Sequence, residues 1–152
     1  MKKFDYENSM GFTVYSASKT MQKAFDLELR NKTGITITQS KVIFALYIQT
    51  GSTLRELADK IGVESPTLVP VIDKMEEDGY VKRKSDSKDR RIKRIYTTSK
   101  TDLLWNSMME CVAQIRKVST KDLTEQEIKS AIKTVKKISE NLVAYLGDSE
   151  GT

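Results

Sequence analysis

Basic side chains crowd the thirteen residues from Lys82 to Arg94, where phosphate binding is the obvious chemistry. This stretch has a net charge of +6, against +5 for the whole 152-residue chain, so the remainder is almost neutral. A solvated, lysine-rich loop is the alternative, but four of the eight bases are arginine. The segment therefore suggests an anionic polymer as partner. Its charged residues are Lys82, Arg83, Lys84, Asp86, Lys88, Asp89, Arg90, Arg91, Lys93 and Arg94.

Composition excludes most catalytic chemistry, because the chain has no histidine and a single cysteine, Cys111. Histidine-based zinc sites, Ser-His-Asp triads and Cys-His pairs all require residues that the chain lacks. Neither common glycine-rich phosphate loop occurs. We therefore expect no enzyme, no cofactor and no metal site.

Length and composition predict a single domain over residues 1–152, located in the cytoplasm. Apolar residues make up 38% and charged residues 31%, which is typical of a charge-rich globular protein. No apolar run approaches the ~18 residues of a membrane span, and residues 1–7 lack the apolar core of a signal peptide. One cysteine cannot form an internal disulfide, which suits a reducing compartment.

Two short helices in the middle of the chain predict a helix-turn-helix. A capping box, Thr53 with Glu56, begins the first helix, and Gly62 ends it. Ser65 as N-cap and Pro66 in the first turn begin the second, which extends to about residue 78. The tight connection between them is typical of this motif.

Residues 80–97 predict a β-hairpin with the basic segment at its tip, because alternating and β-branched residues flank a turn-forming centre. A further capping box, Thr36 with Gln39, begins a preceding helix that extends to Gly51. The predicted fold is mainly α with a small β-hairpin wing, a winged helix-turn-helix at about residues 36–98.

Helices at both ends, about 10–31 and 99–146, present apolar stripes that favour a homodimer. The first ends near Gly34, a candidate left-handed residue. Thr124 and Glu127 predict a capping box for the last helix, which follows heptad spacing. Because the central unit has its own core, these faces are free to pair with a second chain; a monomeric helical bundle is the alternative. The dimerisation residues are Ile128, Val135, Ile138, Leu142 and Tyr145.

In the order of their elements and in their local sequence motifs, residues 10–146 resemble the MarR family of bacterial and archaeal transcriptional regulators. The most specific part is 53–98, with a T-x-x-E-L-A helix, a recognition helix ending in acids and Gly79, and a D-x-x-D-R-R wing. Thr98, which follows, corresponds to a cap of the next helix. The stretch Pro66-Thr67-Leu68-Val69 looks most like the SlyA branch.

The resemblance implies a homodimeric regulator of double-stranded DNA, a repressor, with helix 65–78 in the major groove and wing 82–94 in the minor groove. Arg90 or Arg91 would enter the minor groove. Asp89 would orient a wing arginine, or simply form the turn. The implied contacts add Ser65, Thr67, Val69, Pro70 and Lys74 to the wing bases. A non-specific architectural DNA-binding protein, or a winged helix used for protein contacts, remains as an alternative.

Two residues depart from the family pattern. Pro70 occupies a position where many members carry an arginine, which leaves Thr67 and Lys74 as polar groups on that face. Proline also removes a backbone hydrogen bond and can cost ~3 kcal/mol within a helix. Specificity is therefore expected to lean on the wing and on DNA shape. Thr101 replaces a usual glycine after the wing.

The family is commonly regulated by small aromatic anions or by cysteine oxidation, which implies two further hypotheses. Phe12, Tyr15 and Trp105 would line a ligand pocket, with Lys19 or Arg30 as the partner of an anion; the alternative is ordinary core. Cys111 lies on an apolar stripe, where cysteine is normally inert, and a redox role is the second hypothesis.

Overall fold

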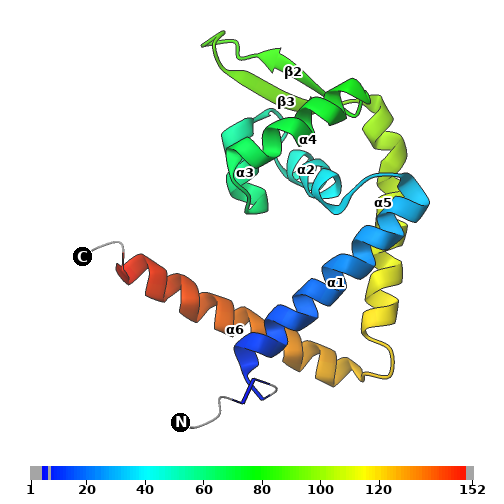
Figure 1. Ribbon diagram of the computed structural model, residues 1–152, viewed down its shortest axis with the longest axis vertical. Helices are drawn as coiled ribbons and strands as arrows, with labels where there is room; N and C mark the ends of the chain where they lie inside the picture. The colour runs from blue at the N-terminus through cyan, green and yellow to red at the C-terminus, as the bar shows by residue number, and fades with distance from the viewer. Residues whose placement is uncertain (1–4, 7, 150–152) are drawn as a thin grey trace. The chain divides into compact units, whose positions relative to one another are not determined.

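A computed structural model describes residues 5–6 and 8–149. Residues 1–4 and 7, which belong to the N-terminal segment predicted to lack a signal peptide, lie outside the described residues. The chain forms two compact units, Gln22–Gln114 and the segments on either side of it. Figure 1 shows the elements in order. They are α1 (Met10–Thr33), α2 (Ile37–Ile48), β1 (Ser52–Thr53), α3 (Leu54–Ile61), α4 (Ser65–Glu77), β2 (Val81–Ser85), β3 (Lys93–Thr97), α5 (Ser99–Ser119) and α6 (Glu125–Ser149).

Local capping chemistry sets most helix ends as the sequence predicts. In α2 the Gln39 amide donates to the Thr36 hydroxyl at 3.2 Å, while the Thr36 amide donates to the Gln39 side chain at 2.7 Å. Thr53 and Glu56 repeat this box in α3, at 3.2 and 2.7 Å. Gly62 ends α3 in the left-handed conformation, with φ of 73°. The capping-box predictions are therefore confirmed.

Two predicted boundaries are wrong. Helix α2 ends at Ile48 rather than Gly51, because Gln49 turns to an extended conformation and the chain proceeds into β1. Ser65 is the first helical residue of α4, not its N-cap. Glu64 is the cap, and its carbonyl accepts from the Thr67 and Leu68 amides at 3.0 and 3.3 Å. No side chain caps this helix.

The sheet has three antiparallel strands in the order β1-β3-β2, so the predicted hairpin is joined by a strand that the sequence did not indicate. Ser52 pairs with Ile95 in β3, and Ile95 pairs with Arg83 on the other side. Gly51 must be glycine, because a Cβ there would lie 2.9 Å from the Tyr96 ring and φ is +74°. The wing is thus attached to the end of α2.

The hydrophobic core of the described structure lies within the unit Gln22–Gln114. Fully buried side chains come from the second half of α1, from α2, α3, α4 and the sheet, and from α5 as far as Cys111. Examples are Leu29, Ile43, Leu57, Ile72, Ile95 and Met108. This core explains why a helix-turn-helix of two short helices is held firmly.

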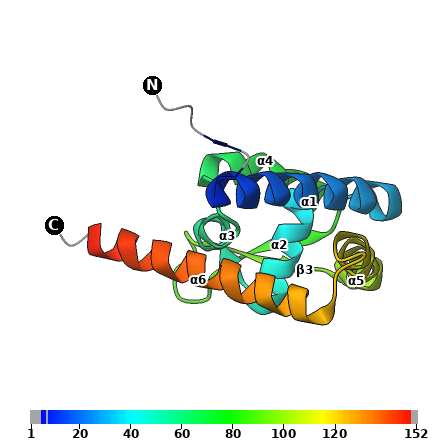
Figure 2. The same cartoon turned by 90° about the horizontal axis from the view of Figure 1, so that it is seen from below.

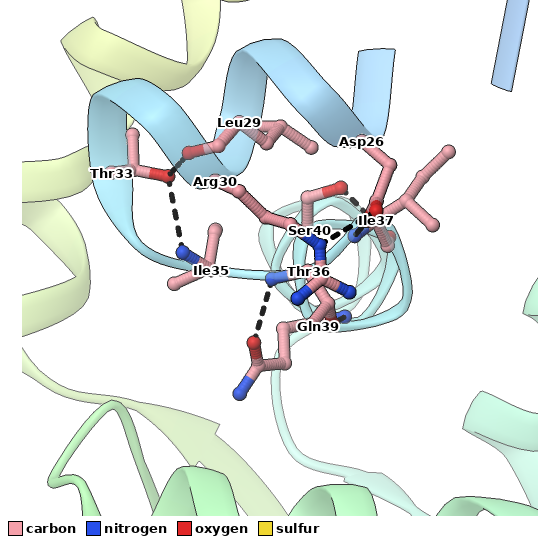
Figure 3. A network of polar contacts seen from close by, with 9 residues as sticks. All are labelled: Asp26, Leu29, Arg30, Thr33, Ile35, Thr36, Ile37, Gln39 and Ser40. Carbon is pink, nitrogen blue, oxygen red and sulfur yellow. Dashed lines mark hydrogen bonds and ion pairs between the residues drawn. The ribbon is translucent and has the colours of Figure 1, made fainter. Parts of the chain in front are cut away.

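A polar network joins α1 to α2 across the turn at residues 34–36 (Figure 3). One oxygen of Asp26 accepts from the Ile37 amide at 2.8 Å, at the N-terminus of α2, and the other pairs with Arg30 at 2.7 Å. These bonds lower the pKa of Asp26, Arg30 contributing most. A carboxylate is well placed at a helix N-terminus, where it complements the dipole. Asp26 therefore links the two helices directly.

The second unit contains the first half of α1, the end of α5 and the whole of α6. Helix α6 is one long unbroken helix (Figure 2). The predicted capping box of α6 is present, with the Glu127 amide 3.3 Å from the Thr124 hydroxyl. Among residues 5–6, 8–21 and 115–147, none is buried, and Val135, Leu142 and Tyr145 are exposed. No helix in the described part of the chain is long and apolar enough to cross a membrane.

Candidate nucleic-acid interface

Helix α4 has one buried face and one exposed face. Leu68, Ile72 and Met75 face the core and are fully buried. The outward positions Pro66, Thr67, Val69, Pro70, Asp73, Lys74 and Glu77 are exposed, whereas Ser65 is half-buried. The helix continues through Pro70. The second helix of the helix-turn-helix therefore presents a surface on which a groove of DNA can lie.

Three contacts tie the end of α4 to the start of α5. The Thr98 hydroxyl donates to the Gly79 carbonyl at 2.6 Å, and Thr98 directly precedes α5; its role as a side-chain cap stays a prediction. Buried Thr101 donates to the Tyr80 carbonyl, which accounts for a hydroxyl at this position. Lys100 donates to the Asp78 carbonyl at 2.7 Å, where a cation complements the helix C-terminus.

Arg83, at the base of the wing, is an internal brace. Its guanidinium pairs with Glu76 at 2.5 Å and with Asp73 at 2.6 Å, and its amide donates to Glu76 at 2.7 Å. The amide and the guanidinium together hold the pKa of Glu76 below its ordinary value. Arg83 thus fixes β2 against α4 and is half-buried.

Arg94 is also used within the fold. It pairs with Asp86 across the hairpin and donates to the Gly51 carbonyl at 2.9 Å. Asp86 accepts in addition from the amides of Lys88 and Asp89, at 2.8 and 3.2 Å. Its hydrogen bond with Arg94 and these two amide bonds lower the pKa of Asp86 to about 2. Arg94 and Asp86 therefore shape the wing and attach it to the end of α2.

The wing tip presents two arginines in different states. Arg91 forms a two-pronged contact with Asp89, from Nε at 3.1 Å and Nη2 at 2.9 Å. Asp89 also accepts from the Arg91 amide at 3.0 Å, so it forms the turn and holds the guanidinium at once. Arg90 is exposed, and no hydrogen bond or ion pair engages its side chain within residues 5–6 and 8–149.

The four wing lysines, Lys82, Lys84, Lys88 and Lys93, are exposed. Lys84 lies 5.6 Å from the centre of the Tyr96 ring, and Lys93 donates to Ser85 at 2.8 Å. These contacts leave the ammonium groups at the surface. On α4, by contrast, Lys74 pairs with Glu77 at 3.1 Å and Asp78 at 3.0 Å.

The sequence therefore predicted one role for all the wing bases, whereas in the structure these bases lie in different environments. It placed Arg83 and Arg94 with the other wing bases, and it missed Asp73, Glu76 and Gly51 as the groups that hold them. The acidic end of α4, followed within seven residues by Arg83, was the available signal for the first brace. No pattern links Gly51 with Arg94, which lie 43 residues apart.

The residues predicted to line a ligand pocket are divided between the two units. Phe12 contacts Tyr6, with ring centres 6.1 Å apart, and Lys19 lies 5.6 Å from the Tyr15 ring. Trp105, in the other unit, packs on Tyr47 at 4.1 Å and on Phe44 at 5.6 Å. The pocket stays a prediction.

Two other groups with chemical potential belong to the same unit as Trp105. Tyr47 donates to Asp102 at 2.5 Å, and burial with this bond raises its pKa to about 12. Cys111 is fully buried, and burial raises the pKa of its thiol. A thiol in such surroundings is typically unreactive, and its redox role stays a hypothesis.

Comparison with known proteins gives the same architecture. The model of the MarR family matches residues 35–93, from the start of the helix-turn-helix region into the wing. A MarR transcriptional regulator of Methanosarcina mazei superposes with a TM-score of 0.78 at 21% identity, covering 89% of this chain and 96% of that one.

Two further similar structures belong to proteins that are each described with a small molecule. BpsR of Bordetella bronchiseptica, whose DNA binding is regulated by 6-hydroxynicotinic acid, has a TM-score of 0.78 and 19% identity over 90% of this chain and 97% of its own. CouR of Rhodococcus jostii, bound to p-coumaroyl-CoA, has a TM-score of 0.74 and 21% identity over 90% and 95%. The chain therefore has the MarR-type winged helix fold.

Proposed function

We propose that this chain is a member of the MarR family and acts in the cytoplasm as a homodimeric, sequence-selective DNA-binding regulator that represses nearby genes. Helix α4 would lie in the major groove and wing residues 82–94 in the minor groove. The protein performs no catalysis in this proposal; its output is occupancy of an operator.

The observation that carries the proposal is the charge distribution on the wing. Arg90, Arg91 and Lys88 are exposed at its tip, while Arg83 holds the hairpin to α4 through ion pairs and Arg94 pairs with Asp86 inside the hairpin and donates to the Gly51 carbonyl. A rigid hairpin with cations at its tip suits a narrow minor groove, where the negative potential is strong. Asp89 holds Arg91 in one orientation, which lowers the entropy lost on binding.

Helix α6 supports the dimer. Ile128, Val135, Ile138, Leu142 and Tyr145 follow heptad spacing, and Val135, Leu142 and Tyr145 are exposed by 47, 57 and 69% in the single chain. Apolar residues at this spacing typically pack against another helix. A two-fold dimer would present two winged helices to half-sites about 34 Å apart.

A small aromatic or anionic effector is the expected regulator, by analogy with BpsR and CouR. The chemical identity of such a molecule differs between those two proteins, one a pyridine carboxylic acid and the other a coenzyme A ester. Release of DNA on addition of an aromatic acid is therefore the behaviour to test after the operator has been found.

Fluorescence anisotropy with the DNA upstream of the chain's own coding region tests the proposal, with random duplex as competitor and at several salt concentrations. We expect binding by two chains per site that survives competitor by a factor of ~10³ or more. Arg90→Ala should reduce the slope of log affinity against log salt by about one. Lys133→Ala, an exposed base on α6, is the matched control and should leave the slope unchanged.

Other outcomes separate the alternatives. An architectural protein would bind this DNA but lose it to random competitor. If the winged helix serves protein contacts instead, replacing both Arg90 and Arg91 would change the measured binding little. If the upstream DNA shows no specific binding, a site selected by the protein from random duplexes replaces it, and failure of that selection would contradict sequence-selective binding.

A further inference from the structure

The exposed face of α4 lacks the side chains that usually identify bases in the major groove. Bidentate contacts to guanine come from arginine or lysine and those to adenine from asparagine or glutamine. Helix α4 contains none of these except Lys74, which is held by Glu77 and Asp78. Its other outward charge near the middle, Asp73, is held by Arg83.

What this face offers instead is apolar. Pro66, Val69 and Pro70, here called the α4 apolar patch, are exposed, and Val69 is exposed by 39%. Residues three and four apart lie side by side on a helix, so Pro66 adjoins both of the others. Thr67 borders the patch and lies three residues before Pro70. The patch therefore occupies the first two turns, the part of a recognition helix that contacts base edges.

The N-terminus of α4 is poorly suited to phosphate. Pro66 has no amide hydrogen, and the Thr67 amide donates to the Glu64 carbonyl at 3.0 Å. Glu64, the exposed N-cap residue, adds a negative charge next to this helix terminus. Exposed cations that can contact the DNA backbone are concentrated on the wing. Helix α4 is therefore expected to contact bases rather than phosphates.

We infer that α4 reads the 5-methyl groups of thymine through its apolar patch, an inference that rests on the proposed DNA-binding function. The thymine methyl is the apolar feature of the major groove, and apolar side chains recognise it by contact. The neighbouring hydroxyl of Thr67 accepts or donates to either base of a pair. Half-sites of this protein are therefore rich in A·T pairs at the positions under α4.

A single chemical change in the DNA tests this. A duplex selected by the protein from a random pool is synthesised with thymidine or with 2′-deoxyuridine, which lacks only the methyl group. The methyl ratio is defined as the dissociation constant for the deoxyuridine duplex divided by that for the thymidine duplex. We expect a methyl ratio of about four for each contacted methyl group.

Variants assign the effect to the patch. Val69→Thr replaces a methyl group by a hydroxyl at nearly constant shape and should lower the methyl ratio by about half or more. Val112→Thr makes the same change at a residue of α5 that is also exposed by 39%, and should retain the wild-type ratio. Pro70→Ala removes the ring while restoring a helical amide; it should fold, as thermal unfolding would check, and should also lower the ratio.

Each result has one meaning. Competitor-resistant binding with a methyl ratio near one overturns the inference but leaves the proposed function intact, and points to recognition by DNA shape. A high ratio that survives in both Val69→Thr and Pro70→Ala overturns the assignment to the patch. Failure to select any duplex overturns the proposed function itself, and the inference with it.

Discussion

Arg83 and Glu76 form a double contact in which the arginine donates from both its backbone and its side chain. The amide lies 2.7 Å and the guanidinium nitrogen 2.5 Å from the two carboxylate oxygens. The pair joins the first residues of the wing to the last turn of α4. Any change in the angle of the wing relative to α4 must therefore break it, which makes the pair a positioning device for the wing and α4, the two elements proposed to contact DNA.

Arg83→Lys should weaken DNA binding without changing its salt dependence. A lysine keeps the charge but cannot serve Glu76 and Asp73 together, because it lacks the planar fork. We expect a loss of about 1 kcal/mol in the free energy of unfolding, measured with denaturant. Arg55→Lys, at an exposed site of α3, is the control. A salt slope reduced by about one in Arg83→Gln, which removes the charge, would mean instead that Arg83 touches phosphate.

Asp89→Asn should lower DNA affinity although it removes a negative charge beside a polyanion. Asparagine retains the turn, since its oxygen still accepts from the Arg91 amide, but the ion pair with the guanidinium is lost. Asp59→Asn, at an exposed position of α3, removes the same charge elsewhere and should leave affinity equal or slightly higher. Titration by anisotropy compares the two. Tighter binding by Asp89→Asn would show that charge outweighs orientation.

Asp86 should make stability sensitive to acid. Its pKa in the folded chain is about 2, below the ordinary 3.8, so the stability it contributes is present above about pH 4 and lost as the pH falls towards 2. The midpoint temperature of thermal unfolding should therefore fall more steeply across this pH window for the wild type than for Asp86→Asn. Parallel curves for the two proteins from pH 5 to 2 would contradict the role of Asp86.

Ile138→Glu combined with Leu142→Glu should yield a monomer. Two carboxylates would have to be buried on the proposed dimer face of α6, which is far costlier than leaving them in water. Sedimentation gives the mass, and circular dichroism confirms that the helices remain. Ala144→Glu adds a charge on the opposite side of α6 and should remain a dimer. A wild-type chain that sediments as a monomer would contradict the dimer.

Much of the fold follows from local chemistry. The capping boxes of α2 and α3 and the left-handed Gly34 and Gly62 depend on atoms only a few residues apart, so residue types and spacing suffice to predict them. The basic wing and the α6 stripe are similarly evident, because charge and periodicity are properties of the chain itself.

Other features were decided by contacts between distant segments. Strand β1 has two residues, too few for any periodic pattern, and exists because β3 pairs with it. The Thr98 hydroxyl donates to Gly79, 19 residues away, a contact that no local pattern indicates. Ser65 lost its predicted cap position because the Glu64 carbonyl accepts the first amides of α4.

The sequence alone determined which residues carry charge and where the helices with a capping box begin. Only the tertiary structure decided that Arg83 and Arg94 are internal braces while Arg90 stays exposed. The physical reason is that an ion pair depends on distance in space. Arg94 meets Gly51 because two strands pair, and Arg83 meets Asp73 because β2 packs beside α4. Neighbouring bases of one type thus acquire different roles only after the chain has folded.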